Sequence, residues 1–146
     1  MRVTIRTVDS KEAEQVVLEC VRMNREFREI KDYCLSRDHA LIAYEDHRAK
    51  QIRYHEILYL EALEDRVFAY TQSGVYEIKS RLYELEELLR PYHFVRCSKA
   101  FIIHLLKVDS IYPALNGRYY ARMVNGEDVM ISRKYARKVK QMIMEG

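Results

Sequence analysis

Basic side chains beside a tight polar step are the residues of this chain best suited to chemistry. The stretch from Phe94 to His104 reads FVRCSKAFIIH, with Arg96 and Lys99 on either side of Ser98. It continues at once into an apolar segment, Phe101 to Ile103, which can anchor the step against a core. A basic residue on a short, rigid loop suits contact with phosphates and base edges. The pattern is weak by itself, because many proteins carry it as a solvated strand end.

A second basic cluster follows a hairpin signal near the C-terminus. Asn125-Gly126 predicts a hairpin turn, and Ser132 then suits the N-cap of a final helix. The basic residues of that helix are Arg133, Lys134, Arg137, Lys138 and Lys140. The last three could equally form no more than a solvated face. The order of the two clusters along the chain makes the pattern specific, and it points to DNA.

The charge is distributed unevenly along the chain, whose net charge is +3. Residues 1–90 carry 15 Lys and Arg against 18 Asp and Glu, a balance of −3. Residues 91–146 carry 10 against 4, a balance of +6. A basic C-terminal third is what a nucleic-acid footprint would produce, although a charge run can also be a solvated face.

Motifs for catalysis are missing. The sequence has no phosphate-cradling glycine loop, no G-x-S-x-G elbow and no metal-spaced histidine pair on a helix. Cys97, His104 and Asp109 are close in sequence, but a cysteine that alternates along a strand favours a core position over a nucleophile. We therefore expect no enzymatic activity and no cofactor.

The histidines and cysteines do not complete a metal site. His39, His47 and His55 repeat every eight residues, yet no further His, Cys or carboxylate pattern completes a ligand set. The three cysteines are widely spaced: Cys20, Cys34 and Cys97. This spacing argues against a disulfide framework and favours buried, reduced thiols. We expect no bound metal.

The composition predicts one main globular domain. The chain has 146 residues, of which 49% are hydrophobic and 32% charged. The longest uncharged apolar run, Ala100 to Leu106, is too short to cross a bilayer. Residues 1–10 alternate Arg and Thr with Val and Ile and contain no apolar segment of the signal-peptide type. The expected location is therefore the cytoplasm, without membrane insertion.

The N-terminal region predicts a short strand and a long helix. Arg2 to Val8 alternates polar and apolar residues, and Ser10 could cap a helix that runs to about Asp32. The apolar stripe of this helix consists of Val17, Cys20, Val21, Phe27 and Ile30. The stripe could pack on the chain's own sheet or on the same helix of a second copy, and the sequence does not choose between the two.

Beyond residue 39 the periodicity becomes that of strands separated by polar turns. Strands are expected at residues 40–44, 57–60, 67–71, 75–78, 94–97, 100–103, 108–112, 118–124 and 129–131. Ser80 could cap a short helix with a leucine face, which Pro91 would end. A turn is expected at Asn116-Gly117. The expected fold class is α+β, mainly β.

From about Ala40 to its end, the chain resembles the LytTR DNA-binding domain of bacterial transcription regulators. The resemblance rests on Ile57 to Glu61, Tyr76 to Leu89, Phe94 to His104, Leu115 to Arg118 and Val124 to Arg133. It implies an N-terminal strand-helix extension, residues 1–39, followed by a LytTR-like domain, residues 40–146. It also implies antiparallel sheets whose connecting loops enter successive major grooves of DNA.

The resemblance implies which residues contact DNA. The first loop would contain Glu64, Asp65 and Arg66, the second would be Ser98-Lys99, and the third would begin at Arg133. The full set of candidate DNA-binding residues is Arg133, Lys99, Ser98, Arg66, Arg96, Lys134, Asn116 and Arg118. Arg133 is the strongest candidate, because arginine can donate two hydrogen bonds to guanine, whereas lysine acts as a point charge.

The chain departs from the commonest form of the family motif at three positions. Ser98 stands where His is common, Ala100 replaces Ser, and His104 replaces Asn. Ser98-Lys99 also occurs in stand-alone members, so DNA binding is expected. The particular target sequence cannot be inferred from the motif. Ala100 lacks a hydroxyl that could contact phosphate. We expect His104 to be a satisfied turn residue without a functional role.

The N-terminal elements resemble those of small stand-alone members, which lack a phospho-acceptor receiver domain and are often encoded beside a small membrane protein. The expected partners are therefore double-stranded DNA, a second copy as a homodimer or on tandem sites, and a neighbouring membrane protein. The alternative is a non-enzymatic protein-interaction module with a basic C-terminal surface. Such a module would ignore duplex sequence, whereas specific DNA binding depends on both sequence and salt.

Overall fold

The computed structural model describes residues 1–145, and their side chains through Met144. Its helices and strands are α1 (Arg25–Ser36), β1 (Ala40–Glu45), β2 (Arg48–Arg53), β3 (Ile57–Leu63), β4 (Arg66–Thr71), β5 (Val75–Ile78), α2 (Leu82–Leu89), β6 (Phe94–Arg96), β7 (Phe101–His104), β8 (Val108–Pro113), β9 (Tyr119–Met123), β10 (Asp128–Ile131) and α3 (Arg133–Glu145). The strands form a seven-stranded sheet in the order β2-β1-β5-β4-β3-β7-β6 and a three-stranded sheet in the order β10-β9-β8. All strand pairs are antiparallel, so the mainly β, α+β fold class is confirmed.

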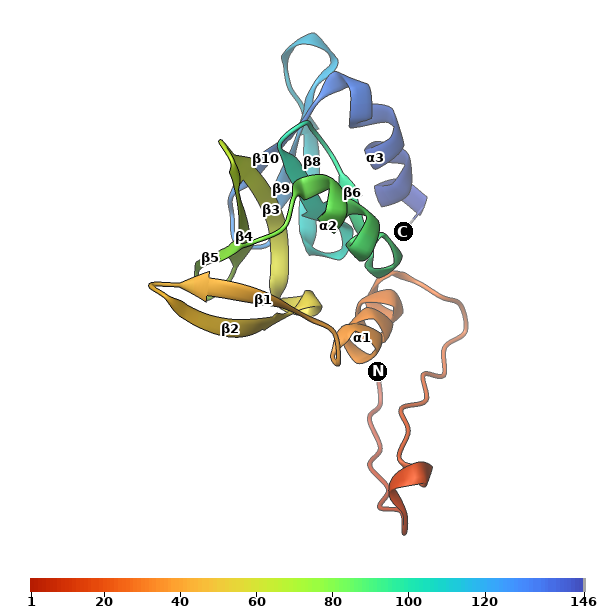
Figure 1. The fold of residues 1–146 in the computed structure, drawn as a ribbon. Helices are drawn as coiled ribbons and strands as arrows, with labels where there is room; N and C mark the ends of the chain where they lie inside the picture. The colour runs from red at the N-terminus through yellow and green to blue at the C-terminus, as the bar shows by residue number, and fades with distance from the viewer. Residues whose placement is uncertain (146) are drawn as a thin grey trace.

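Strands β3, β6 and β7 lie between two hydrophobic clusters. On one face, Leu82, Leu85 and Leu89 of α2 pack against the seven-stranded sheet. On the other face, the three-stranded sheet and the Ala136 and Val139 side of α3 cover these strands. Figure 1 shows α2 in front of the strands and α3 beside them. The strands that carry the central loops are therefore held from both sides.

A β-bulge breaks the alternation of side chains along β3, where four consecutive residues are buried. Ile57 and Leu60 belong to the cluster beneath α2, whereas Leu58 and Tyr59 belong to the cluster beneath the small sheet. The register between β3 and β4 shifts between Ile57 and Tyr59, which places neighbouring side chains on one face. A buried run without simple alternation is typical of a strand with both faces covered.

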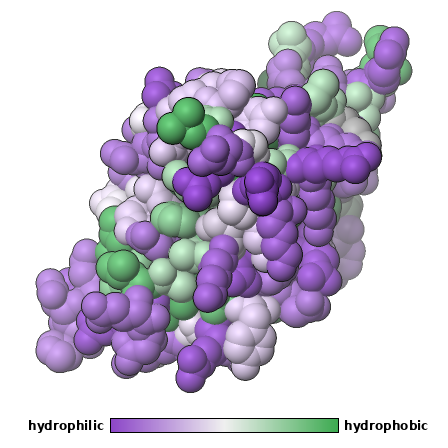
Figure 2. Space-filling view, turned by 90° about the horizontal axis from the view of Figure 1, so that it is seen from above, coloured by the Kyte–Doolittle hydropathy of each residue, from purple (hydrophilic) through white to green (hydrophobic). Residues whose placement is uncertain are grey.

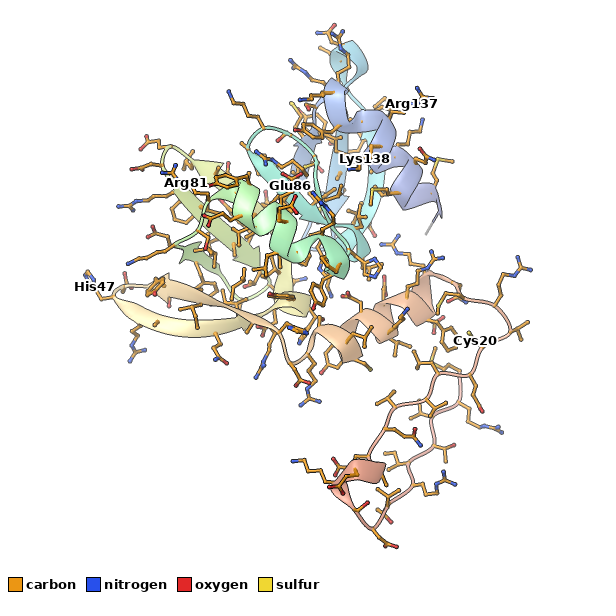
Figure 3. All side chains as sticks on the ribbon, turned by 45° about the vertical axis from the view of Figure 1, so that its right-hand side comes forward. Cys20, His47, Arg81, Glu86, Arg137 and Lys138 are labelled. Carbon is orange, nitrogen blue, oxygen red and sulfur yellow. The ribbon has the colours of Figure 1, made fainter. Side chains whose placement is uncertain are left out.

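The structure contains one strand that the sequence did not predict. β2 exposes all of its residues except Ile52, and it lies at the edge of the large sheet. Charged residues on an edge strand discourage pairing with other chains, and they also remove the apolar alternation on which prediction depends. Asp46 and His47 form its turn with positive φ angles of 48° and 70°. His47 thus lies at a hairpin tip (Figure 3), and no group of three or more metal-ligating side chains occurs within residues 1–145.

The predicted N-terminal strand is wrong, and the predicted long helix is right only in its C-terminal part. Within the described chain, residues 2–8 join no sheet, and the helix begins at Arg25 instead of after Ser10. Asn24 is its N-cap, with the side-chain oxygen accepting the Phe27 N–H at 2.9 Å. Residues upstream have nothing to pack against, and an amphipathic stripe without a partner surface does not stabilise a helix. Accordingly, Val17 is 65% exposed.

Helix α1 is attached to the domain through a buried polar contact. His104 is fully buried at the end of β7, where it stacks on Phe94 and its Nδ1 lies 2.9 Å from the Ile57 carbonyl oxygen. Its Nε2 lies 3.3 Å from a carboxylate oxygen of Asp32, too poorly aligned for a hydrogen bond. His104 is therefore a core residue that packs against α1. The prediction that it is a satisfied turn residue is wrong, because it is fully buried and its Nε2 makes no hydrogen bond.

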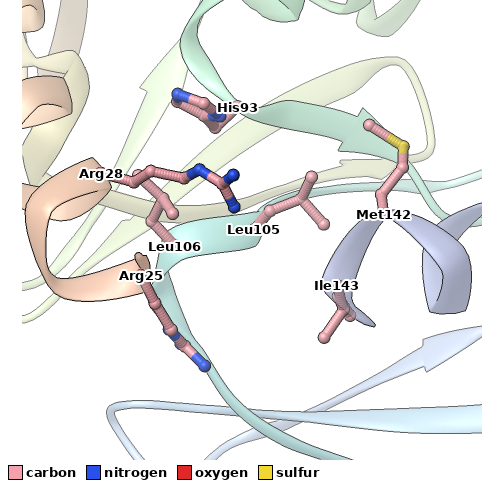
Figure 4. Close-up of a pocket in the computed structure, with 7 residues that line it drawn as sticks. All are labelled: Arg25, Arg28, His93, Leu105, Leu106, Met142 and Ile143. Atoms are coloured by element: carbon pink, nitrogen blue, oxygen red, sulfur yellow. The ribbon is translucent and has the colours of Figure 1, made fainter. Parts of the chain in front are cut away.

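A cavity of about 260 Å³ lies between α1 and α3 at the edge of the domain. Figure 4 shows α1 residues Arg25 and Arg28 on one side and α3 residues Met142 and Ile143 on the other. The Arg25 side chain pairs with Glu29 and donates to the backbone carbonyl of Val108. The contact of Arg25 with Val108 thus joins α1 to the rest of the domain beside this cavity.

The cysteines differ from the expectation of buried thiols. Cys97 is buried, Cys34 is partly buried, and Cys20 is exposed (Figure 3). Burial raises the pKa of the Cys97 thiol to about 12, so it stays protonated and unreactive. No helix within residues 1–145 is long and apolar enough to span a bilayer.

Candidate nucleic-acid interface

Five loop regions lie around the upper half of the domain as drawn in Figure 1, with the loop before β9 and the start of α3 uppermost. They are the β3–β4 turn, the start of α2, the β6–β7 loop, the loop before β9 and the start of α3. Figure 2 looks down on this end and shows hydrophilic side chains over most of the face. The apolar strands beneath these loops fix their positions, so polar side chains there are presented on a rigid platform.

The first part of this face is a groove of about 250 Å³ between the β3–β4 turn, α2 and the β6–β7 loop. We name it the first basic groove. Its basic lining residues are Arg66, Arg81, Arg96 and Lys99. Glu64 and Asp65 on the turn also line it, and Glu64 has a positive φ of 60° that the tight turn requires. The groove is therefore mixed in charge.

Arg96 is held by the protein's own groups. Its Nη1 pairs with Glu86 at 2.9 Å, its Nε donates to the Ser98 carbonyl at 2.8 Å, and its Nη2 donates to the Lys99 carbonyl at 2.6 Å. The guanidinium is thus a clamp that joins α2 to the β6–β7 loop. Arginine suits this task because its donors lie in a rigid plane.

The Ser98 side chain also orders the β6–β7 loop. Its Oγ accepts hydrogen bonds from the Ala100 N–H at 3.3 Å and the Phe101 N–H at 3.1 Å. A hydroxyl that caps backbone N–H groups in this way makes a compact turn. Lys99 at the loop tip is exposed. The loop is therefore internally braced, and its lysine extends into solvent.

The second part of the face is an open groove of about 620 Å³, here named the second basic groove. It is lined by Asn116, Arg118, Ser132, Arg133 and Lys134. None of these five residues carries a carboxylate, so the groove has a single sign of charge. Four of the residues predicted to bind DNA meet here, although up to 18 positions separate them in the sequence.

A close glycine contact holds Arg133 in the second basic groove. A Cβ atom on Gly117 would lie 2.9 Å from Cδ and 3.0 Å from Cγ of Arg133. The arginine stem therefore packs directly on the glycine backbone. Asn116 and Gly117 have φ angles of 61° and 76°, which asparagine and glycine tolerate best. The Asn-Gly pair thus forms the turn and also seats the arginine.

The two grooves are fixed relative to each other by backbone contacts. The Ser132 N–H donates to the Cys97 carbonyl at 2.9 Å, which joins the start of α3 to the β6–β7 loop. The Cys97 thiol contributes weaker contacts to the carbonyls of Phe101 and Met130. Lys99 and Arg133 are consequently carried by adjacent, hydrogen-bonded segments.

The remaining basic residues of α3 have different surroundings. Lys140 donates to the Tyr119 hydroxyl at 3.3 Å and lies over the Tyr119 ring, so it helps to attach the helix to the small sheet. Arg137 and Lys138 are exposed (Figure 3). The last two extend the positive surface away from the second basic groove.

A model of the LytTr DNA-binding domain family matches residues 47–144. The chain belongs to the LytTr DNA-binding domain family. The match begins inside the β1–β2 hairpin and includes both basic grooves. A solved LytTr DNA-binding domain, from a Bacillus cereus protein described as a methyl-accepting/DNA response regulator, has the same fold. It shares 25% identity and a TM-score of 0.67, covering 71% of this chain and 95% of that chain.

Related proteins are similar over more of the chain. An uncharacterized HTH-type transcriptional regulator of Staphylococcus aureus (strain MSSA476) is 26% identical over 139 residues, covering 93% of this LytTr chain and 94% of the relative. Another from Staphylococcus aureus (strain NCTC 8325) is 28% identical over 109 residues, covering 75% and 74%. The likeness to the first relative thus includes much of the N-terminal extension that precedes the LytTr domain.

Two residues of the LytTr face were missed by sequence reasoning. Arg81 and Tyr83 line the first basic groove beside Arg66 and Lys99. The predicted cap of α2 was Ser80, whereas the structure has Arg81 as N-cap, with its N–H donating to the Glu84 carboxylate at 2.8 Å. An acidic residue three positions after a possible cap was the available signal.

Proposed function

We propose that this protein regulates transcription by binding duplex DNA sequence-specifically through the two basic grooves. The observation that carries this proposal is the hydrogen bond between Ser132 and Cys97, which places Lys99 and Arg133 on one braced face. Cations held on rigid loops can contact base edges as well as phosphates, whereas a merely basic surface only attracts phosphates. Membership in a DNA-binding domain family supports the same conclusion.

Arg133 is the proposed base-contacting residue of the second basic groove. It is exposed, it opens α3, and its stem is seated on Gly117. A seated arginine loses little conformational entropy when it donates two hydrogen bonds to guanine. Lys134, Arg118 and Lys99 are exposed cations around it and are proposed to contact phosphates. The Asn116 side chain can donate or accept a hydrogen bond at the edge of the groove.

The start of α3 is electrostatically unfavourable without an anion. Its first turn contains Arg133 and Lys134 and no acidic residue. The N-terminal end of a helix carries a partial positive charge, so each cation there costs about 0.3–1 kcal/mol. A DNA phosphate would reverse this cost. Such local instability is typical of a binding site and supports the proposal.

The first basic groove has a different proposed role. Glu64 and Asp65 would repel phosphates, although a carboxylate can accept a hydrogen bond from the amino group of cytosine. Arg66 and Arg81 lie beside them and can contact the backbone. Arg96 is proposed to position the β6–β7 loop, because its donors are already directed at Glu86 and at loop carbonyls.

Two copies are proposed to bind paired or tandem half-sites. A single DNA-binding module buries roughly 600–1,000 Å², which is modest for regulatory affinity. Two linked modules gain affinity without any new contact, because the second binding event becomes intramolecular. A membrane protein encoded beside the gene stays a predicted partner, and a cytoplasmic location stays a prediction.

A comparison of two variants tests the division of roles. Arg133→Ala should weaken binding to the specific duplex by about 1–3 kcal/mol and flatten the preference at one base pair. Lys138→Ala, on the same helix, should weaken specific and shuffled duplexes alike. Fluorescence anisotropy on both duplexes measures this difference. Equal losses on the two duplexes for Arg133→Ala would remove its assignment as a base-contacting residue.

A further inference from the structure

The cavity between α1 and α3 has basic side chains at one end and apolar side chains at the other. It shares no lining residue with either basic groove. Its lining residues are Arg25, Arg28, His93, Leu105, Leu106, Met142 and Ile143. Figure 4 shows Arg28 extending from α1 toward Leu105, with Met142 and Ile143 of α3 on the opposite side. None of the lining residues carries a carboxylate, so the cavity is amphipathic with a positive end.

The charge at the positive end fits one singly charged anion. Arg25 pairs with Glu29 at 3.2 Å, so this acidic residue outside the lining offsets one of the two arginines. Arg28 supplies the second positive charge. His93 is neutral at neutral pH, because burial lowers the pKa of its imidazole and outweighs the opposing effect of Asp32. A carboxylate therefore balances this end of the cavity, whereas a doubly charged phosphate would exceed it.

The side chains at this end also offer hydrogen bonds to a carboxylate. Arg25 donates to Glu29 and to the Val108 carbonyl, which uses two of the five N–H donors of an arginine. A carboxylate accepts paired hydrogen bonds from a guanidinium, and a neutral histidine can donate one more. Arg25 is also the first residue of α1, where the helix dipole disfavours a cation. An anion in the cavity would offset that unfavourable interaction.

The apolar end of the cavity suits a short hydrocarbon chain. Leu105, Leu106 and Ile143 are half-buried, and Met142 is 36% exposed. A chain placed along them would remove this apolar surface from water, and the flexible methionine can adapt to its shape. The volume of 260 Å³ is that of about nine water molecules, which corresponds to a carboxylate with roughly six to eight carbon atoms.

We propose that the cavity between α1 and α3 is an effector site for a small aliphatic monocarboxylate. The carboxylate is held at the arginine end, and the chain extends toward α3. Helix α3 begins at Arg133 in the second basic groove, and its last turn lines the cavity. A ligand that joins this turn to α1 restrains the helix, so that DNA binding has less left to order. The regulatory effect rests on the proposed DNA binding, whereas binding of the carboxylate does not.

Octanoate is a suitable ligand for testing the site by NMR of ¹³C-labelled methionine methyl groups in the full chain. A molecule of about ten non-hydrogen atoms should bind with a dissociation constant of about 0.1–1 mM. The Met142 signal should shift on titration. The Met144 signal should not, because Met144 lies on the same helix outside the cavity and is 75% exposed.

Two further compounds test the two ends of the cavity separately. Acetate has the head group without the chain, and octylammonium has the chain with the opposite charge. Neither should shift the Met142 signal at concentrations at which octanoate does. Equal shifts with octylammonium would overturn the role of the arginines, and equal shifts with acetate would overturn the role of the apolar end.

A pair of matched variants tests the location by calorimetric titration with octanoate. Met142→Glu places a carboxylate at the apolar end of the cavity and should weaken binding at least tenfold. Met144→Glu is the same substitution two residues later on α3 and should bind like the wild type. Circular dichroism should show both variants folded like the wild type, since both positions are exposed. Unchanged binding by Met142→Glu would place octanoate elsewhere and overturn the proposal.

The effect of octanoate on DNA binding separates an effector site from a ligand site without regulatory effect. Saturating octanoate should tighten binding of the specific duplex about fivefold in the wild type and have no effect on Met142→Glu. The specific duplex should tighten octanoate binding by the same factor, because the coupling is reciprocal. Unchanged DNA affinity would reject the effector role even if the Met142 signal shifted. Absence of sequence preference with and without octanoate would instead reject the proposed function.

Discussion

Gly117→Ala is predicted to impair DNA recognition by displacing Arg133, although Gly117 itself is not proposed to contact DNA. The added Cβ would lie 2.9 Å from Cδ and 3.0 Å from Cγ of Arg133. Carbon atoms without a bond between them prefer separations of about 3.5–4.0 Å. The arginine stem must therefore move by about 0.5–1 Å, which exceeds the tolerance of a two-donor contact to a base.

The expected size of the effect follows from the contact that would be lost. A good two-donor pair contributes about 1–3 kcal/mol of discrimination against the wrong base. Gly117→Ala should therefore reduce the ratio of specific to shuffled binding by roughly 5- to 150-fold. The substitution also costs about 1–2 kcal/mol of folding stability, because alanine is strained at a φ of 76°. Both quantities can be measured on the same purified sample.

Gly126→Ala provides the control for backbone strain. Gly126 has a φ of 88°, but a Cβ there would meet no atom within 4 Å. In thermal unfolding, the melting temperatures of the two variants should fall by similar amounts. In anisotropy titrations, only Gly117→Ala should lose preference for the specific duplex. If both variants retained the same preference as the wild type, the seating of Arg133 on Gly117 would have no role in recognition.

Three further predictions concern the groups that support the face. Arg96→Ala should release the β6–β7 loop from Glu86, which faster hydrogen exchange of the loop amides would show; unchanged exchange would contradict the clamp. The hydrogen bond from Arg122 to Asp128 lowers the pKa of that carboxyl, so its stabilisation is present at neutral pH and lost as pH falls below about 4. Urea unfolding of Asp128→Asn should therefore show a weaker acid dependence than the wild type, and an identical dependence would exclude this pair as its source. His104→Ala should cost about 3 kcal/mol in urea unfolding, because it opens a cavity and leaves a buried carboxylate without its neighbour; a loss below about 1 kcal/mol would contradict that role.

The strands were predictable wherever an apolar pattern marked a buried face. Residues 57–60 of β3 and 102–103 of β7 are buried aliphatic and aromatic residues, so the positions of these strands followed from the sequence. The position of β2 could not be predicted in this way, because an edge strand gains little from burial and carries charges instead. The start of α1 also escaped prediction. Ser10 and Asn24 are equally suitable caps, and only the packing of the segment that follows decides between them.

The residues of the candidate interface were predictable as a set, but not their individual roles. Arg133, Lys134, Asn116 and Arg118 meet in one groove because antiparallel strands bring their loops to one end of the sheets. The use of Arg96 as a clamp depends on Glu86, which lies on another element, and no local pattern encodes that contact. The resemblance to the family indicated the loops, whereas the structure separates bracing side chains from exposed ones.

Selection from a random duplex library, followed by anisotropy across a salt series, tests the central claim most directly. The account predicts that one sequence is enriched and that it binds more tightly than its shuffled version at every salt concentration. Both affinities should fall as salt rises, and Lys134→Ala should reduce the salt slope by about one. Absence of enrichment, with equal affinity for selected and shuffled duplexes, would contradict sequence-specific recognition and leave only a basic surface.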